Sequence, residues 1–110
     1  MENDRYFYAV ITENHRTVYD RNDCAFTENY GTGDERYFGN FDNAVKRFNE
    51  LRTRALEDIE NVKKECPEDE ISVDNDRKYI FSYTVTEANS DDLVSSANHC
   101  IRIIREELAD

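Results

Sequence analysis

The feature that most constrains the fold is a long apolar stripe with helical spacing between residues 41 and 62. Apolar side chains recur there at steps of three and four positions, and they are Phe41, Ala44, Val45, Phe48, Leu51, Ala55, Ile59 and Val62. This spacing places them on one side of an α-helix. Asn40 or Asp42 can cap its start by accepting a hydrogen bond from an amide of the first turn. Pro67 ends it near residue 65. The stripe therefore predicts one long helix with one buried side.

Residues 78 to 87 alternate between larger apolar and more polar side chains, which is the period of a β-strand. One face carries Tyr79, Phe81, Tyr83 and Val85, and the other carries Ile80, Ser82, Thr84 and Thr86. Such unequal faces are typical of a sheet that helices cover on a single side. We therefore expect a strand here with its apolar face toward the helical layer.

Further strands are predicted on both sides of the long helix. Residues 5 to 12 are rich in aromatic and β-branched side chains, which favour strands. A polar break at residues 13 to 16 precedes Thr17-Val18-Tyr19, so we expect an antiparallel hairpin. Residues 71 and 73 alternate as in a short edge strand before a turn at residues 74 to 77. The irregular segment 20 to 39 is expected to hold one more short strand, near residues 24 to 27 or 36 to 38.

A second helix is predicted to begin at Ser90-Asp91-Asp92, where a capping residue is followed by carboxylates. Its apolar stripe consists of Leu93, Ala97, Cys100, Ile101, Ile104 and Leu108. The resulting element order is ββαββα. We therefore expect a single α+β domain, residues 1–110, that forms a two-layer sandwich: an antiparallel sheet of about four strands with two helices on one face.

The acidity of the chain limits the kind of partner that it can bind. Its 110 residues include 14 lysines and arginines against 25 aspartates and glutamates, a net charge of −11. Nucleic acids and anionic membranes are disfavoured partners, because binding to them depends on an excess of cations. A basic protein surface is favoured. The alternative is that the acidity serves solubility only.

The sequence predicts a cytoplasmic protein. The start MENDRYFY lacks the basic and apolar regions of a signal peptide, and no apolar stretch reaches the roughly 18 residues of a membrane span. Cys24, Cys66 and Cys100 are odd in number and show no CxxC spacing. Reduced thiols in a reducing compartment fit this pattern best.

Each resemblance to a catalytic or cofactor motif fails on a required residue. Gly31-Thr32-Gly33 lacks the GK[ST] ending of a phosphate loop, and Asp74-Asn75-Asp76 lacks the glycine and glutamate of a calcium loop. His99 and the cysteines do not form the tight ligand pairs of a structural zinc site. On a helix, His99 and Cys100 point about 100° apart, which places Cys100 in the core and His99 in solvent. We therefore expect no metal, no cofactor and no enzymatic activity.

Charge is distributed unevenly along the chain. Residues 65 to 76 contain six carboxylates and no basic residue, whereas residues 41 to 64 carry six basic and five acidic side chains. The residues predicted to contact a partner are Glu68, Asp69, Glu70, Asp74, Asp76, Asp20, Asp23, Asp34, Glu35 and Tyr30. Tyrosine is included because it supplies a large contact area with a polar tip. A merely solvated surface is the alternative for each acidic cluster.

In size, acidity, tyrosine content and lack of a catalytic motif, the whole chain resembles small phage- or plasmid-encoded anti-defence proteins, especially anti-CRISPR and DNA-mimic inhibitors. The resemblance implies an inhibitor whose carboxylates occupy the basic nucleic-acid groove of a nuclease or effector complex. A regulatory or assembly protein that acts by homodimerisation is the alternative function. A small enzyme with an unrecognised site is a third hypothesis.

Overall fold

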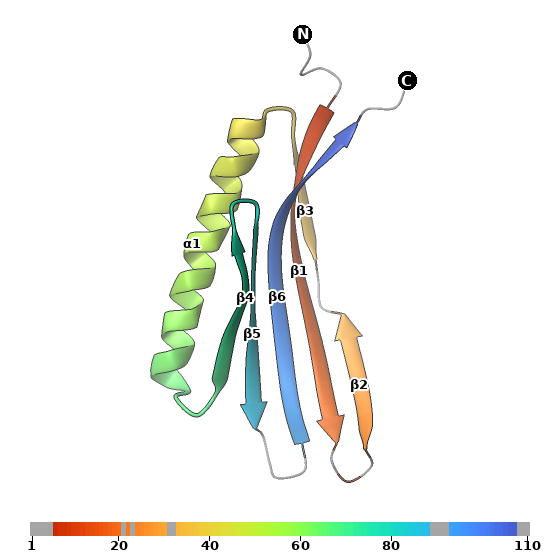
Figure 1. The fold of residues 1–110 in the computed structure, drawn as a ribbon, viewed down its shortest axis with the longest axis vertical. Coiled ribbons are helices and arrows are strands. Elements are labelled where there is room, and N and C mark those ends of the chain that lie inside the picture. Colours follow the sequence, from red (N-terminus) through yellow and green to blue (C-terminus); the bar gives the residue numbers. More distant parts are fainter. Residues whose placement is uncertain (1–5, 21, 23, 31–32, 89–92, 108–110) are drawn as a thin grey trace.

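The protein is built from a long antiparallel sheet with a helix along one of its faces (Figure 1). The computed structural model describes residues 6–20, 22, 24–30, 33–88 and 93–107. Within these residues the elements are β1 (Tyr6–Asp20), β2 (Ala25–Tyr30), β3 (Asp34–Phe38), α1 (Phe41–Glu65), β4 (Glu70–Arg77), β5 (Ile80–Ala88) and β6 (Leu93–Glu107). The predicted two-helix ββαββα sandwich is therefore wrong in the described part of the chain, where one helix accompanies six strands.

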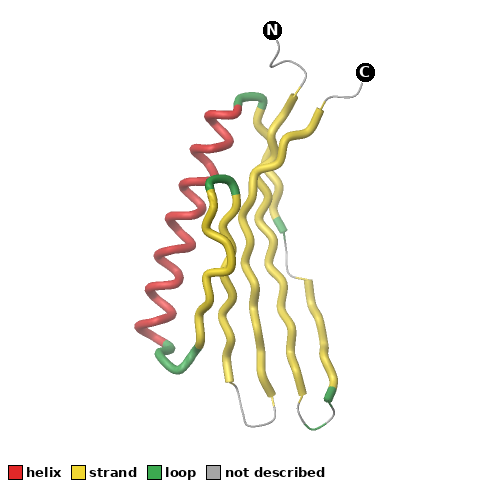
Figure 2. The backbone as a smooth tube through the Cα atoms, in the orientation of Figure 1, coloured by secondary structure: helices red, strands yellow, loops and turns green. Residues whose placement is uncertain are grey.

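The six strands occupy five positions across the sheet, in the order β2-β1-β6-β5-β4. The short strand β3 pairs with residues 8–12 of β1, and β2 pairs with residues 15–20, so the two share one edge of β1. Every neighbouring pair of strands is antiparallel. Figure 2 shows the helix beside this sheet, with the start of β1 and the end of β6 at the same end of the molecule.

The long helix confirms the prediction from its apolar stripe. Asn40 caps α1, because its side-chain oxygen accepts hydrogen bonds from the amides of Asp42 (2.8 Å) and Asn43 (3.2 Å). The helix extends over 25 residues and ends at Glu65, just before Pro67. Its most buried side chains are Ala44, Phe48, Ala55 and Ile59. One side of the helix therefore packs on the sheet while the other side faces solvent.

The core lies between α1 and the face of the sheet that the helix covers. Phe48 and Phe81 are each 1% exposed and are the largest fully buried side chains. Phe81, Tyr83 and Val85 of β5 all contribute to this core, which confirms the predicted apolar face of that strand. Val10 of β1 and Ile101 of β6 complete the sheet side of the cluster.

The predicted C-terminal helix is instead the strand β6, which lies in the middle of the sheet. It pairs with β1 over its whole length and with β5 over residues 94–102. A central strand is flanked by neighbours on both edges, and its two faces both carry apolar side chains, such as Ile103 toward the core and Ile104 on the opposite side. Its apolar residues therefore fit a helical period as well as a strand period. The β-branched and polar side chains of this segment favour the strand.

The predicted hairpin within residues 5 to 19 is also wrong, because β1 continues through the polar segment 13 to 16. These polar side chains find partners on β6. Glu13 accepts a hydrogen bond from Arg102 (2.7 Å), and Arg16 donates one to Ser95 (3.3 Å). Asn14 is hydrogen-bonded to His99. Cross-strand pairing of this kind lets a polar segment remain in a sheet.

The remaining short strands were predicted in part. The segment 20 to 39 holds β2 and β3, close to both predicted positions, and β4 is an edge strand as expected. The predicted turn at residues 74 to 77 is wrong, because the chain stays in β4 and turns at Lys78 and Tyr79. A β-bulge interrupts the pairing between Val73 and Asn75. Bulges increase the local twist and change the direction in which side chains point.

Candidate functional site

The residues predicted to contact a partner do not form one surface. Five of them follow the β4 edge, Asp20 ends β1, and Asp34 and Glu35 lie on β3 at the other edge of the sheet. The two edges are four strand spacings apart, about 19 Å. Tyr30 belongs to β2, and Asp23 lies outside the described residues. The predicted set is therefore divided between opposite sides of the molecule.

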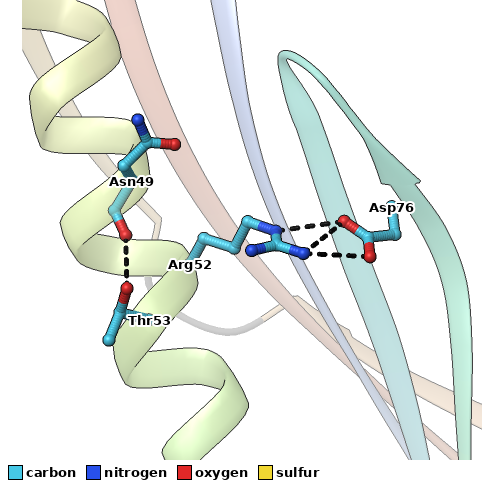
Figure 3. A network of polar contacts seen from close by, with 4 residues as sticks. All are labelled: Asn49, Arg52, Thr53 and Asp76. Carbon is cyan, nitrogen blue, oxygen red and sulfur yellow. Dashed lines mark hydrogen bonds and ion pairs between the residues drawn. The ribbon is translucent and has the colours of Figure 1, made fainter.

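Asp76 is held by a cation on the helix (Figure 3). Its carboxylate accepts hydrogen bonds from Arg52 Nε (3.0 Å) and Nη2 (2.8 and 3.0 Å), and the Arg52 guanidinium also lies over the ring of Phe81 at 5.4 Å. Thr53, one residue further along α1, donates its hydroxyl to the carbonyl of Asn49 (2.9 Å). Planar two-atom pairing of this type is the strong form of an arginine–carboxylate contact. Asp76 therefore joins α1 to β4 rather than adding charge to a binding surface.

Asp74 lies at the bulge and is engaged by its neighbours in the sheet. Its carboxylate accepts hydrogen bonds from Thr84 (2.6 Å), Ser72 (3.0 Å) and Asn98 (3.3 Å). These donors come from β5, β4 and β6. A carboxylate that already accepts three hydrogen bonds has little remaining capacity for a partner's guanidinium. We therefore remove Asp74 and Asp76 from the candidate site.

The remaining carboxylates of the β4 region gather where α1 ends. Cys66 caps the helix by donating its amide to the carbonyl of Val62 (2.8 Å), and its own carbonyl accepts from the amide of Asp69 (3.0 Å). Partial burial raises the pKa of the Cys66 thiol, and nearby carboxylates raise it further. In decreasing order of effect, these carboxylates belong to Asp69, Glu68, Glu65 and Glu87.

These groups define a surface that we call the acidic end. It comprises Glu65, Glu68, Asp69, Glu70 and Glu87. Its residues come from the end of α1, the turn before β4, the start of β4 and the end of β5, which Figure 1 shows close together below the helix. Four of the five are exposed, and Asp69 is half-buried. Three separate elements therefore bring negative charge to one place.

Lys63 and Lys64 in the last turn of α1 are the nearest cations along the chain, but the ion pairs of the described residues include no carboxylate of the acidic end. They involve Glu13, Glu50, Glu60 and Asp76, and Lys63 in the last turn of α1 pairs with Glu60 at 3.5 Å. The C-terminus of a helix also carries the negative end of its dipole, equivalent to about half an elementary charge. The helix dipole therefore adds to the negative potential of the carboxylates, while Lys63 and Lys64 in the same turn reduce it.

Sequence reasoning missed Glu87 and left Glu65 out of the proposed contact set. Glu87 is far from Glu65 along the chain and belongs to the strand prediction, not to the acidic run. The usable signal was the antiparallel pairing of two neighbouring strands, because the pair Glu70 and Thr86 places Glu87 beside the start of β4. Pairing register, and not local charge density, completes this surface.

A second polar group lies in a cavity of about 220 Å³ between α1 and the sheet. His99 stacks on Tyr83 with ring centroids 4.8 Å apart and is hydrogen-bonded to Asn14. Burial lowers the pKa of His99, and the carboxylate of Asp58 partly opposes this. The predicted exposed position of His99 is thus wrong. It was based on a helix, whereas in β6 the side chain lies toward α1.

The chemistry available to His99 is limited by its partners. His99 Nδ1 faces the side-chain oxygen of Asn14, which can only accept, so Nδ1 donates this hydrogen bond in the tautomer that is protonated there. The hydrogen bonds of the described residues link His99 to an amide and not to a hydroxyl or thiol. Nucleophilic catalysis needs a histidine that is hydrogen-bonded to a hydroxyl or a thiol. The contacts of His99 are therefore those of a structural residue under the helix.

Among the described residues, no group of three or more histidine, cysteine, aspartate or glutamate side chains is placed to hold a metal ion. Within the same part of the chain, no helix combines the length and apolar character needed to cross a bilayer.

Comparison with known proteins adds no relative. No family model matches the sequence, and no curated protein or solved structure matches the chain. Function is therefore inferred from the chain's own residues.

Proposed function

We propose that this protein is a non-enzymatic cytoplasmic inhibitor that binds the basic surface of a nucleic-acid-binding protein or complex through its acidic end. The observation that supports the proposal most is the gathering of Glu65, Glu68, Asp69 and Glu87 around Cys66. These four carboxylates come from the end of α1, the turn before β4 and the end of β5, and no cation is ion-paired with them among the described residues. Their charge is available to a partner.

The physical basis of the interaction is charge complementarity. Carboxylates on a surface form charge-assisted hydrogen bonds with arginine and lysine, as nucleic-acid phosphates do. A coherent negative patch also steers a basic partner during diffusional encounter. Occupation of the partner's basic groove excludes nucleic acid from it. Inhibition follows from this competition and requires no reaction on the acidic protein.

The test uses two triple variants with the same change in net charge. The first, Glu65→Lys with Glu68→Lys and Asp69→Lys, reverses the acidic end. The control, Asp34→Lys with Glu57→Lys and Glu106→Lys, reverses exposed carboxylates elsewhere on the molecule. Each protein is immobilised and used to capture proteins from a bacterial lysate at low salt, and duplex DNA is then added as a competitor.

The expected result is that the wild type and the control variant capture nucleic-acid-binding proteins, which DNA and high salt release. The acidic-end variant should lose this capture and show a flatter salt dependence. Equal loss in both variants would mean that net charge alone acts, and undiminished capture by the acidic-end variant would exclude this surface. Either result contradicts the proposal.

The alternative is homodimerisation through a sheet edge or a helix face, and its sheet-edge form has less support. The exposed edge of β4 is interrupted by a bulge and carries Asp74, Asp76 and Arg77. The other edge consists of two short strands, β2 with six residues and β3 with five, and β3 begins with Asp34 and Glu35. Bulges, charges and short strands are the devices that keep edges from pairing. A sedimentation measurement tests this alternative: a stable dimer would favour it over the inhibitor.

A further inference from the structure

The other end of the molecule holds a cavity of about 390 Å³ with largely aromatic walls. It is lined by Tyr8, Phe41, Tyr79, Ile103 and Arg105. The ring centroids of Tyr8 and Phe41 are 5.1 Å apart, and those of Phe41 and Tyr79 are 5.4 Å apart at an interplanar angle of 75°. Ring contacts of this kind fix the walls relative to one another. The volume is within the range of small-molecule sites, about 300–1,000 Å³.

The walls of this cavity are positioned by backbone structure. Tyr79 lies in the tight turn between β4 and β5, and its carbonyl accepts a hydrogen bond from the amide of Ile103 on β6 (3.0 Å). Phe41 is the first residue of α1, directly after the capping Asn40. Tyr8 is paired with Arg105 across β1 and β6. The cavity is therefore largely formed before any ligand enters.

Two cations rest on aromatic rings here: Arg105, which lines the cavity, and Lys78, the chain neighbour of the lining residue Tyr79. The Arg105 guanidinium carbon lies 4.6 Å from the centroid of the Tyr6 ring, and Lys78 Nζ lies 5.7 Å from that of Tyr79. Neither cation belongs to an ion pair in the part of the chain that the structure describes. A cation that stacks on a ring keeps its outward hydrogen-bond donors for another group.

We propose that this cavity binds a small planar aromatic ligand that carries an anionic group. The ring of the ligand lies against Phe41 and Tyr79, and its anionic group accepts hydrogen bonds from Arg105. In a chain of net charge −11, unpaired cations beside an aromatic cavity are the specific feature that favours an anion. An aromatic carboxylate and a mononucleotide share this chemistry.

The experiment follows backbone amide signals by NMR while probes are added to the full chain. The probes with both features are 4-hydroxybenzoate and adenosine 5′-monophosphate. Matched probes remove the charge (4-hydroxybenzyl alcohol and adenosine) or the ring (acetate and inorganic phosphate). Saturable shifts at Tyr79, Ile103 and Arg105 with at least one complete probe, and none with the matched probes, support the proposal. Binding of 4-hydroxybenzoate would indicate an aromatic carboxylate as the ligand, and binding of adenosine 5′-monophosphate would indicate a mononucleotide.

Substitutions then test the cation and the ring separately. Arg105→Gln removes the charge of an exposed side chain, and the Kd of the binding probe should rise about tenfold, as expected for one charge-assisted hydrogen bond. Tyr79→Leu keeps an apolar wall but removes the ring, and it should weaken binding as well. Lys64→Gln at the far end of α1 is the matched control and should leave the Kd unchanged.

The proposal is overturned by any of three results. The first is the absence of saturable shifts below about 10 mM probe, which is weaker than a specific site of this size should bind. The second is equal binding of charged and neutral probes. The third is an Arg105→Gln variant that binds as the wild type does while its spectrum shows a folded protein. None of these depends on the acidic end, so the two proposals fail independently.

Discussion

The two ends of α1 have opposite electrostatic surroundings. At its start, Arg105 and Lys78 lie over aromatic rings near a cavity, and at its end four carboxylates of the acidic end gather around Cys66. The helix dipole has the same sign as these groups at each end, whereas Asp42 in the first turn of α1 and Lys63 and Lys64 in the last turn have the opposite sign. The two ends also differ in how firmly their charged side chains are held. Aromatic rings hold the two cations in place, whereas the carboxylates of the acidic end have no such contact in the described part of the chain. The start of α1 therefore suits a ligand of defined shape, and the end of α1 suits a broad basic surface.

The largest effect on both ends of α1 is expected from removing the core packing in the middle of the helix. Phe48 is 1% exposed in the middle of α1, and Phe48→Ala should lower the free energy of unfolding by about 3–5 kcal/mol. Leu56→Ala, at a position 37% exposed on the same helix, is the control and should change it by about 0.5 kcal/mol or less. Urea denaturation measures both. Similar losses in the two variants would show that the core is not where the structure places it.

A smaller effect is expected when only the start of the helix is changed. Asn40→Ala removes the side-chain oxygen that caps α1 and should cost about 1 kcal/mol. Asn40→Asp keeps a capping oxygen and should cost much less. Amide hydrogen exchange should accelerate at Asp42 and Asn43 and remain unchanged at the last turn of α1. Faster exchange at both ends would mean that the start of α1 cannot be destabilised independently of its last turn.

The Arg52–Asp76 pair offers a test of the middle of the helix. Arg52→Gln should lower the free energy of unfolding by less than about 1 kcal/mol, because both side chains are partly exposed to solvent. Lys63→Gln changes the net charge equally but removes a more exposed contact, the one with Glu60. Urea denaturation should therefore give the larger loss for Arg52→Gln. The reverse order would contradict a structural role for this pair.

Cys66 reports the potential of the acidic end with almost no change in stability. Its raised pKa leaves less of the reactive thiolate at a given pH, so alkylation by iodoacetamide should be slower than for a cysteine in an unstructured peptide. Reversing Glu65, Glu68 and Asp69 to lysine should lower the pKa and accelerate the reaction. The control triple variant should not. Peptide-level mass spectrometry across a pH series measures the rate of alkylation. Equal rates in both variants would contradict the clustering of carboxylates around Cys66.

The sequence predicts the secondary structure of elements that have one buried side. It does not predict the secondary structure of elements whose two faces both carry apolar residues. The stripe of α1 and the alternation of β5 each have a single reading, and both were predicted correctly. In β6, the spacing of Ala97, Ile101 and Ile104 fits a helix and a central strand equally. In β1, polar residues suggested a turn, but partners on β6 hold them in the sheet.

The candidate site was predicted in part for a related reason. The acidic run from residue 65 to 76 was visible, but its members do not share one surface. Residues two apart in a regular strand lie on the same face. The bulge at Asp74 breaks this rule, so that Asp74 reaches Thr84 and Asn98 while Asp76 reaches Arg52 on the helix. Local composition carries no information about such a bulge.

The pairing of β1 with β6 has a consequence for how the chain is made. Tyr6 is aligned with Glu107 and Asp20 with Leu93, so the middle of the sheet joins the first and last described strands. A ribosome adds about 5–20 residues per second. For some seconds β1 therefore has partners on one edge only, and its other edge stays unpaired until β6 has emerged. We expect nascent chains stopped before residue 93 to be bound by chaperones and sensitive to proteases.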